Sequence, residues 1–67
     1  MKSNLTAGQL FKEARLKKGL TQLQVATKSD IHPNTYAKIE RGEQDPSFST
    51  IKKLARVLDL EIKDIPA

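Results

Sequence analysis

The sequence contains no cysteine and only one histidine among its 67 residues. It therefore has no disulfide, and it lacks the ligand spacing of a structural zinc site. A chain of this length buries only about 60% of the surface that its unfolded form exposes. Packing among short helices must then hold the fold together, and we expect neither a metal ion nor another cofactor.

Long apolar runs and the usual parts of an active site are also missing. No stretch approaches the roughly 18 consecutive apolar residues of a membrane span, and the N-terminal sequence MKSNLTAGQL lacks the apolar core of a signal peptide. A single histidine, no cysteine and no Gly-rich phosphate loop leave little for catalysis. The sequence predicts a soluble, cytoplasmic protein that is not an enzyme.

The charge is unbalanced towards lysine and arginine. The 12 basic side chains outnumber the 8 acidic ones, which gives a net charge of +4 and a pI near 9.6. This balance favours polyanionic partners. It does not by itself distinguish a nucleic-acid-binding surface from an ordinary solvated one, because small soluble domains are often this basic.

Glycine and proline are few, and they separate segments of helical periodicity. This pattern predicts an all-α fold of five short helices and no strand. One domain is expected over residues 1–67, with a core from about 7 to 65 and frayed ends at 1–4 and 66–67. The predicted helices cover about residues 7–18, 21–28, 32–41 and 48–58, and a last short turn lies in the sequence LEIKDI.

Capping signals set the expected helix boundaries. Thr6 is placed to cap the first helix, and Thr21 with Gln24 has the spacing of a capping box. Pro33 suits the first position of the third helix, where its missing N–H needs no partner. Gly19 supplies the left-handed residue that follows a helix.

Apolar side chains at helical spacing define the expected core. One face of the fourth helix carries Phe48, Ile51, Leu54, Ala55 and Leu58. The residues expected to close the core after it are Leu60, Ile62 and Ile65.

The second and third predicted helices are joined by only about three residues, Ser29 to Ile31. Helices joined so tightly cannot form a long hairpin and must cross at a steep angle. The small side chain of Ala26 allows a close crossing, and Val25 and Tyr36 are placed to face the core. This spacing is typical of a helix-turn-helix, whose second helix lies in the DNA major groove. An ordinary small helical bundle with a tight turn is the alternative.

The stretch GLTQLQVATKSDIHPNTYAKIERGEQDPSFSTIKKLARVLDL resembles the lambda-repressor-like helix-turn-helix family of the Cro/C1 or XRE type. The motifs occur in the order and spacing of that family: LTQ, Ala26, IERG, and PS followed by an amphipathic helix. The resemblance covers about residues 7–65. It implies a compact five-helix DNA-binding domain that regulates transcription, with double-stranded DNA as partner. It further implies a repressor acting as a homodimer on a near-palindromic operator. An antitoxin-like or adaptor module, which binds a protein and has secondary DNA binding, is the alternative.

Two groups of residues depart from the family pattern. Asp30 and Asp59 occupy positions where the family usually has glycine, and aspartate tolerates a left-handed conformation at modest cost. Leu10, Leu16 and Leu23 are apolar where such proteins often carry polar groups. We expect these leucines mainly to enlarge the core; a contact with another chain is the alternative.

The third predicted helix has a face that cannot pack inward, and this face is expected to read DNA bases. Asn34 can pair with adenine through two hydrogen bonds, Lys38 can reach guanine acceptors, and Ala37 leaves room for a thymine methyl group. His32 and Pro33 lie at the helix start, nearest the base edges, and His32 is also a candidate cap or phosphate contact. Thr35 suits either kind of contact. A merely solvated face is the alternative.

Backbone phosphates are expected to meet a second set of residues. Gln22 opens the second helix, and the resemblance implies that the glutamine of this TQ pair contacts a phosphate. Arg41, Gly42 and Gln44 follow the reading face, and Lys28 and Lys17 are weaker electrostatic candidates.

An ion pair is expected between Arg15 and Glu40. Arg15 follows Phe11 by one helical turn, so its stem passes along the core edge, and Glu40 has the same relation to Tyr36. Charged side chains are rarely buried unless they are paired. The family resemblance implies the same contact, which would tie the first helix to the end of the third. Two solvated charges that merely match the family pattern are the alternative.

Overall fold

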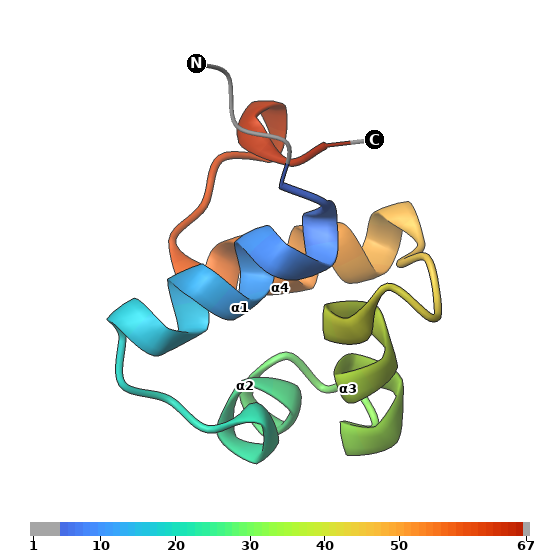
Figure 1. The fold of residues 1–67 in the computed structure, drawn as a ribbon. Coiled ribbons are helices and arrows are strands. Elements are labelled where there is room, and N and C mark those ends of the chain that lie inside the picture. Colours follow the sequence, from blue (N-terminus) through green and yellow to red (C-terminus); the bar gives the residue numbers. More distant parts are fainter. Residues whose placement is uncertain (1–4, 67) are drawn as a thin grey trace.

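The computed structural model describes residues 5–66, and within this range four α-helices are followed by one 3₁₀ turn. Figure 1 shows their arrangement. In Figure 1 α1 and α4 lie next to each other, α2 and α3 lie together on one side of them, and η1 lies on the opposite side. The radius of gyration is 10.7 Å, close to the value of about 11 Å for a compact chain of this length. The elements are α1 (Ala7–Lys17), α2 (Gln22–Lys28), α3 (Pro33–Arg41), α4 (Phe48–Leu58) and η1 (Ile62–Asp64).

The prediction of five helices is wrong by one, because the last predicted helix is only the three-residue turn η1. Its backbone bonds join Asp64 N to Glu61 O at 2.9 Å and Ile65 N to Ile62 O at 3.0 Å. Ile65 then adopts an extended conformation, which the following Pro66 favours, so the turn does not continue as a helix. The expectations for residues 1–4 and 67 lie outside the described residues.

The predicted capping signals are confirmed at the helix starts. Thr6 and Thr21 each accept a backbone N–H three residues later, and the glutamine at that position bonds back to the threonine N–H. These capping boxes satisfy amides that would otherwise lack partners. Ser47 caps α4 in a similar way through the Thr50 N–H.

Each of the four α-helices is followed, one or two residues after its last residue, by a residue of positive φ. Gly19 and Gly42 fill two of these positions, at φ +70° and +78°. Asp30 and Asp59 fill the other two, both at φ 57°, as the sequence predicted. The backbone N–H of the following residue then bonds to a carbonyl five residues earlier, as in Ile31 N to Ala26 O at 2.9 Å. Each helix therefore stops sharply, and the short connections between helices keep fixed directions.

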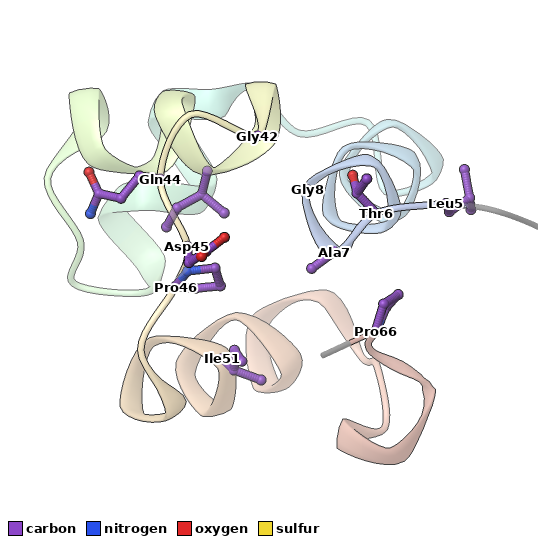
Figure 2. A pocket seen from close by; sticks show the side chains of 11 residues that line it. Leu5, Thr6, Ala7, Gly8, Gly42, Gln44, Asp45, Pro46, Ile51 and Pro66 are labelled. Carbon is purple, nitrogen blue, oxygen red and sulfur yellow. The ribbon is translucent and has the colours of Figure 1, made fainter.

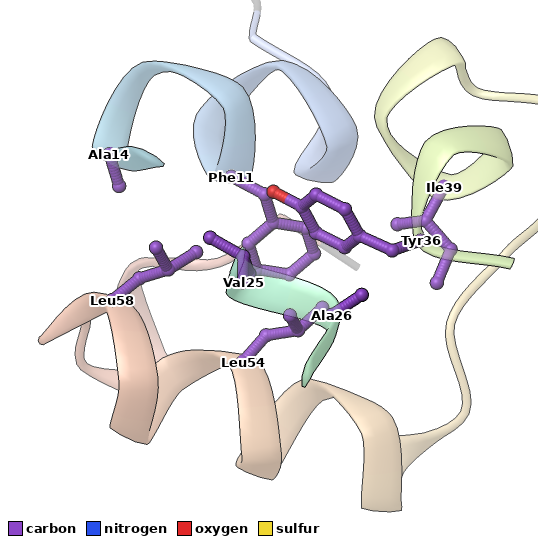
Figure 3. Close-up of a cluster of buried hydrophobic side chains, with 8 residues drawn as sticks. All are labelled: Phe11, Ala14, Val25, Ala26, Tyr36, Ile39, Leu54 and Leu58. Atoms are coloured by element: carbon purple, nitrogen blue, oxygen red, sulfur yellow. The ribbon is translucent and has the colours of Figure 1, made fainter. Parts of the chain in front are cut away.

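The core is a single cluster that draws side chains from all four α-helices (Figure 3). The rings of Phe11 and Tyr36 are at its centre and are fully buried. Around it pack partly buried side chains that include Leu60 and Ile65, as expected. The buried members of the cluster are Phe11, Ala14, Val25, Ala26, Tyr36, Ile39, Leu54 and Leu58.

Gly8 lies inside α1 and allows the backbones of α1 and α3 to touch. A Cβ atom built on Gly8 would lie 2.2 Å from the carbonyl oxygen of Ile39 and 2.7 Å from that of Glu40. Only a residue without a side chain fits there. The role of Gly8 is not predicted from the sequence, because glycines and prolines were expected only between helices and the partner backbone belongs to a distant segment.

Several apolar residues expected in the core are exposed. Phe48 is 64% exposed because it occupies the first turn of α4 at the edge of the apolar stripe, where its ring lies 5.5 Å from the Lys52 ammonium. Ile62 is also exposed, so only its neighbours Leu60 and Ile65 close the core. Leu16 and Leu23 do not enlarge the core. Each is two residues from a buried position, which turns it to the opposite side of its helix.

Candidate nucleic-acid interface

The helix-turn-helix consists of α2, the connection at residues 29–32, and α3. Ile31 packs against the core, and Ser29, two residues earlier in the connection, is also buried. Val25 and Ala26 of α2 are fully buried, as the close crossing of the two helices requires. The turn is therefore held by core contacts from both sides.

The two faces of α3 differ sharply in burial. Tyr36, Ile39 and Glu40 are buried against the rest of the protein. On the other face Asn34 and Lys38 are exposed, while Thr35 and Ala37 are partly buried. The structure thus brings the expected base-reading residues together at the start and along the outer side of one helix, where no other described element covers Asn34 or Lys38.

His32 and Pro33 form the start of α3. His32 is the N-cap, and its Nδ1 accepts the backbone N–H of Asn34 at 3.1 Å. Pro33 takes the first helical position, where its missing N–H costs nothing. Both side chains are exposed.

Arg15 and Glu40 form the expected contact between α1 and α3. The Arg15 Nε donates to Glu40 Oε2 at 2.7 Å and its Nη2 donates to Oε1 at 3.2 Å, the fork geometry that suits a guanidinium and a carboxylate. The third guanidinium nitrogen, Nη1, donates to the carbonyl of Leu20 at 3.0 Å. The Arg15 side chain is 11% exposed and that of Glu40 is 3% exposed. One arginine therefore fixes α1, the connection to α2 and the end of α3.

Gln22 joins this network, a role that the sequence did not reveal. Its Nε2 donates to Glu40 Oε1 at 2.9 Å, so the first residue of α2 is tied to the end of α3. The bond orients the side-chain amide, which leaves a second N–H for a phosphate. No local sequence signal indicated this bond, because the two residues belong to different helices.

Burial alone would raise the pKa of the Glu40 carboxyl. Hydrogen bonds from Arg15 and Gln22, with the Tyr36 hydroxyl nearby, outweigh that effect and hold this pKa below its usual range. The same carboxylate bond raises the pKa of Arg15. Burial, assisted by the Glu40 charge, raises the pKa of Tyr36 well above its ordinary value. Glu40 is therefore ionised and Tyr36 neutral near pH 7.

The residues expected to contact phosphates lie around the helix-turn-helix. Arg41 is exposed and its guanidinium holds Glu43, with Nε 2.9 Å from Oε2, which lowers the pKa of Glu43. Such an exposed pair is weak, so a phosphate can compete for Arg41. Gly42 and Gln44 follow on the connection to α4, and both are exposed.

Lys28 and Lys17 are the other expected phosphate contacts. They are the last residues of α2 and α1, and both are exposed. Neither forms an ion pair with another described residue. Their charges are therefore available to a polyanion.

A surface cleft of about 530 Å³ lies between the start of α1, the connection from α3 to α4, and α4 (Figure 2). Gly42, Gln44 and Pro46 line one wall, Gly8 and Ile51 lie on others, and no described group of three or more His, Cys, Asp or Glu side chains is placed to hold a metal ion. Within residues 5–66 no helix is both long enough and apolar enough to cross a membrane.

Comparison with known proteins relates this geometry to DNA-binding regulators. The sequence model of a family described as helix-turn-helix matches residues 11–65. An immunity repressor protein of Bacillus phage phi105 is 36% identical over 61 residues, which is 91% of this chain. The chain spans 42% of the length of that repressor.

Two solved structures have a similar fold. The restriction-modification controller protein C.AhdI of Aeromonas hydrophila has a TM-score of 0.81 and 37% identity, with 85% of this chain and 86% of that chain covered. The biofilm master regulator SinR, in complex with DNA, has a TM-score of 0.83 and 30% identity, with 88% and 95% covered.

Proposed function

Since the chain belongs to the helix-turn-helix family of the Cro/C1 type, we propose that it is a sequence-specific DNA-binding transcriptional regulator that reads the major groove with α3. The observation that carries this proposal is the construction of α3. Its inner face is anchored by the core and by Arg15 and Gln22, while the side chains of Asn34 and Lys38 stand exposed on the outer face. The phage relative is named as a repressor, and we propose repression for this chain too.

We further propose that residues 7–65 act as one domain and that two copies bind a near-palindromic operator. One recognition helix reads only a few base pairs, and a symmetric pair doubles the length of sequence that is read. The fully shared core supports the single domain. The exposed Ile62 on η1, or the exposed Leu16 and Leu23, would supply apolar surface for the contact between copies.

Selection of binding sites from a pool of random DNA duplexes tests the proposal and identifies the operator sequence in the same experiment. We expect the enriched duplexes to carry two related half-sites. On such a duplex, Asn34→Ala and Lys38→Ala should each lose about 1–3 kcal/mol of binding free energy and relax the preference at one base position. Arg41→Ala should weaken binding to all sequences about equally.

Lys53→Ala is the matched control, because Lys53 is an exposed cation on α4, outside α2, α3 and the residues proposed for the contact between copies. It should change the affinity little and the sequence preference not at all. A wild-type protein that enriches no sequence would refute the proposed function. A single protected half-site with one bound copy would refute only the dimer.

A protein-binding role is the second candidate, and the exposure of Leu16 and Leu23 favours it. Large exposed apolar patches mark contacts with another chain, and these two leucines are the large exposed hydrophobic side chains of α1 and α2. A tight protein complex that forms without any DNA retention at moderate salt would support this role over DNA binding.

A further inference from the structure

The N-cap bond of α3 determines which nitrogen of His32 carries a proton. The backbone N–H of Asn34 donates to His32 Nδ1 at 3.1 Å. A backbone N–H can only donate, so Nδ1 must be the unprotonated nitrogen of the ring. The neutral imidazole then carries its proton on Nε2. The ring is exposed, and Nε2 has no hydrogen-bond partner among residues 5–66.

We propose that His32 is a specificity-determining residue that donates its Nε2–H to N7 of a purine in the major groove. This inference rests on the DNA-reading function proposed above. A group that can only donate rejects the amino groups of adenine and cytosine and bonds to an acceptor. N7 is the acceptor that both purines present in the major groove, and O6 of guanine and O4 of thymine are the other acceptors there. In a docked helix-turn-helix the N-terminal residues of the recognition helix are the ones that reach base edges.

The backbone at the start of α3 makes the ring donor more valuable. Pro33 has no N–H, and the Asn34 N–H is already bonded to the cap. Two of the first backbone positions of α3 therefore offer no donor to DNA. The His32 ring accepts the Asn34 N–H through Nδ1, so this amide cannot bond to DNA. Its own Nε2–H, farther from the helix, is a donor in place of that amide.

Two substitutions separate the two roles of the ring. In His32→Asn the side-chain oxygen stands where Nδ1 was, so the cap is kept and the outer donor is lost. In His32→Gln the amide reaches towards the position of Nε2, so a donor is kept and the cap is weakened. His32→Asn should therefore preserve thermal stability and change the base preference. His32→Gln should preserve the base preference and lower the melting temperature by about 5 °C.

The test uses the full chain and the duplex obtained by selection. Each purine in turn is replaced by an analogue in which a C–H group replaces N7. We expect one position in each half-site at which the wild-type protein loses about three- to tenfold in affinity per recognition helix. His32→Asn should be insensitive to the analogue at that position, and His32→Gln should remain sensitive. Thr6→Asn, the same kind of cap exchange at α1, should keep the wild-type sensitivity.

Nitrogen-15 NMR of the free protein, at mildly alkaline pH where an ordinary imidazole is neutral, should show the His32 proton on Nε2. A proton on Nδ1 would overturn the inference. So would equal sensitivity of the wild type and His32→Asn to every N7 replacement. A His32-dependent loss on neutralising one phosphate, with no loss at any N7, would assign the ring to the DNA backbone and also overturn it. If Lys38→Ala still relaxes a base preference in these cases, only the role of His32 fails and the proposed function stands.

Discussion

Replacing Arg15 by alanine is expected to destabilise the fold and to weaken DNA binding without removing a DNA contact. The Arg15 guanidinium makes three hydrogen bonds, two to the Glu40 carboxylate and one to the Leu20 carbonyl. Without it, the side-chain bond that Glu40 keeps within residues 5–66 comes from Gln22 at 2.9 Å. A nearly uncompensated carboxylate would then stay in a site where its side chain is 3% exposed.

The expected cost is a large share of the total stability. Removing one partner of a buried ion pair costs about 3–5 kcal/mol. A chain of this length has a free energy of unfolding of roughly 3–10 kcal/mol. Since each kcal/mol shifts the melting temperature of a small domain by about 4–8 °C, Arg15→Ala should lower it by about 12 °C or more. Glu40→Ala should have a similar effect, because it leaves the guanidinium unpaired.

Thermal and urea unfolding followed by circular dichroism measure this cost. Lys18→Ala is the matched control, because it breaks an ion pair with Asp59 in which the two side chains are 36% and 75% exposed. That variant should lose under about 1 kcal/mol. Replacing Arg15 and Glu40 together by methionine should recover much of the loss, since no unpaired charge remains. If Arg15→Ala and Glu40→Ala both keep nearly wild-type stability, the ion pair does not hold the fold and this reasoning is wrong.

The pH dependence of stability gives an independent check on the same pair. The folded state holds the pKa of Glu40 below its ordinary value, so folding favours the ionised carboxylate. The stabilisation is complete above the ordinary glutamate pKa of about 4.3 and is lost as the pH falls through the lowered value. The stability gap between the wild type and Glu40→Gln should therefore narrow below about pH 4. A gap that stays constant through the acid range would show that the charge of Glu40 contributes nothing.

Three further outcomes are expected. Gly8→Ala should destabilise the protein by about 1–3 kcal/mol, despite the better helix propensity of alanine, because the new Cβ would lie 2.2 Å from the Ile39 carbonyl oxygen. Urea unfolding measures this loss, and an unchanged midpoint would contradict the close approach. Asp30→Gly should raise the free energy of unfolding by up to about 1 kcal/mol, because glycine adopts φ 57° without strain. Asp59→Gly should raise it less, because this variant also loses the hydrogen bond from Lys18, and a larger gain for Asp59→Gly would contradict the reasoning. If each monomer neutralises three or four phosphates, a plot of the logarithm of the dimer's DNA-binding constant against the logarithm of salt concentration should have a slope of about −5 to −7. A flat plot would argue against DNA binding.

The parts of this fold that sequence reasoning predicted are those encoded locally. A capping box needs only Thr21 and Gln24 three positions apart, and a left-handed helix end needs only a residue that tolerates positive φ, such as Asp30. These signals gave the type and most boundaries of the four α-helices. The prediction of a fifth helix in the last short segment was wrong, because Pro66 follows too soon for a helix to form.

The features that were missed depend on how distant segments meet. The bond between Gln22 and Glu40, and the backbone contact at Gly8, exist only after three helices have docked. Periodicity also cannot say where a core stops. Phe48 falls on the apolar side of α4, yet it lies in the first turn, beyond the other core side chains, and remains exposed.

The small size of the protein explains why a charged network lies behind α3, the helix proposed to read DNA. α3 has nine residues, too few to be stable alone in water, and its outer face is polar, as the proposed contact with DNA requires. The remaining faces have to supply all the contacts that position it. Apolar packing of Tyr36 and Ile39 is not directional, whereas the forked bonds from Arg15 to Glu40 fix both the depth and the rotation of the C-terminal half of α3. Ile31, which packs against the core just before α3, holds the other end, so the angle proposed for α3 in the groove depends on contacts with the rest of the protein at both of its ends.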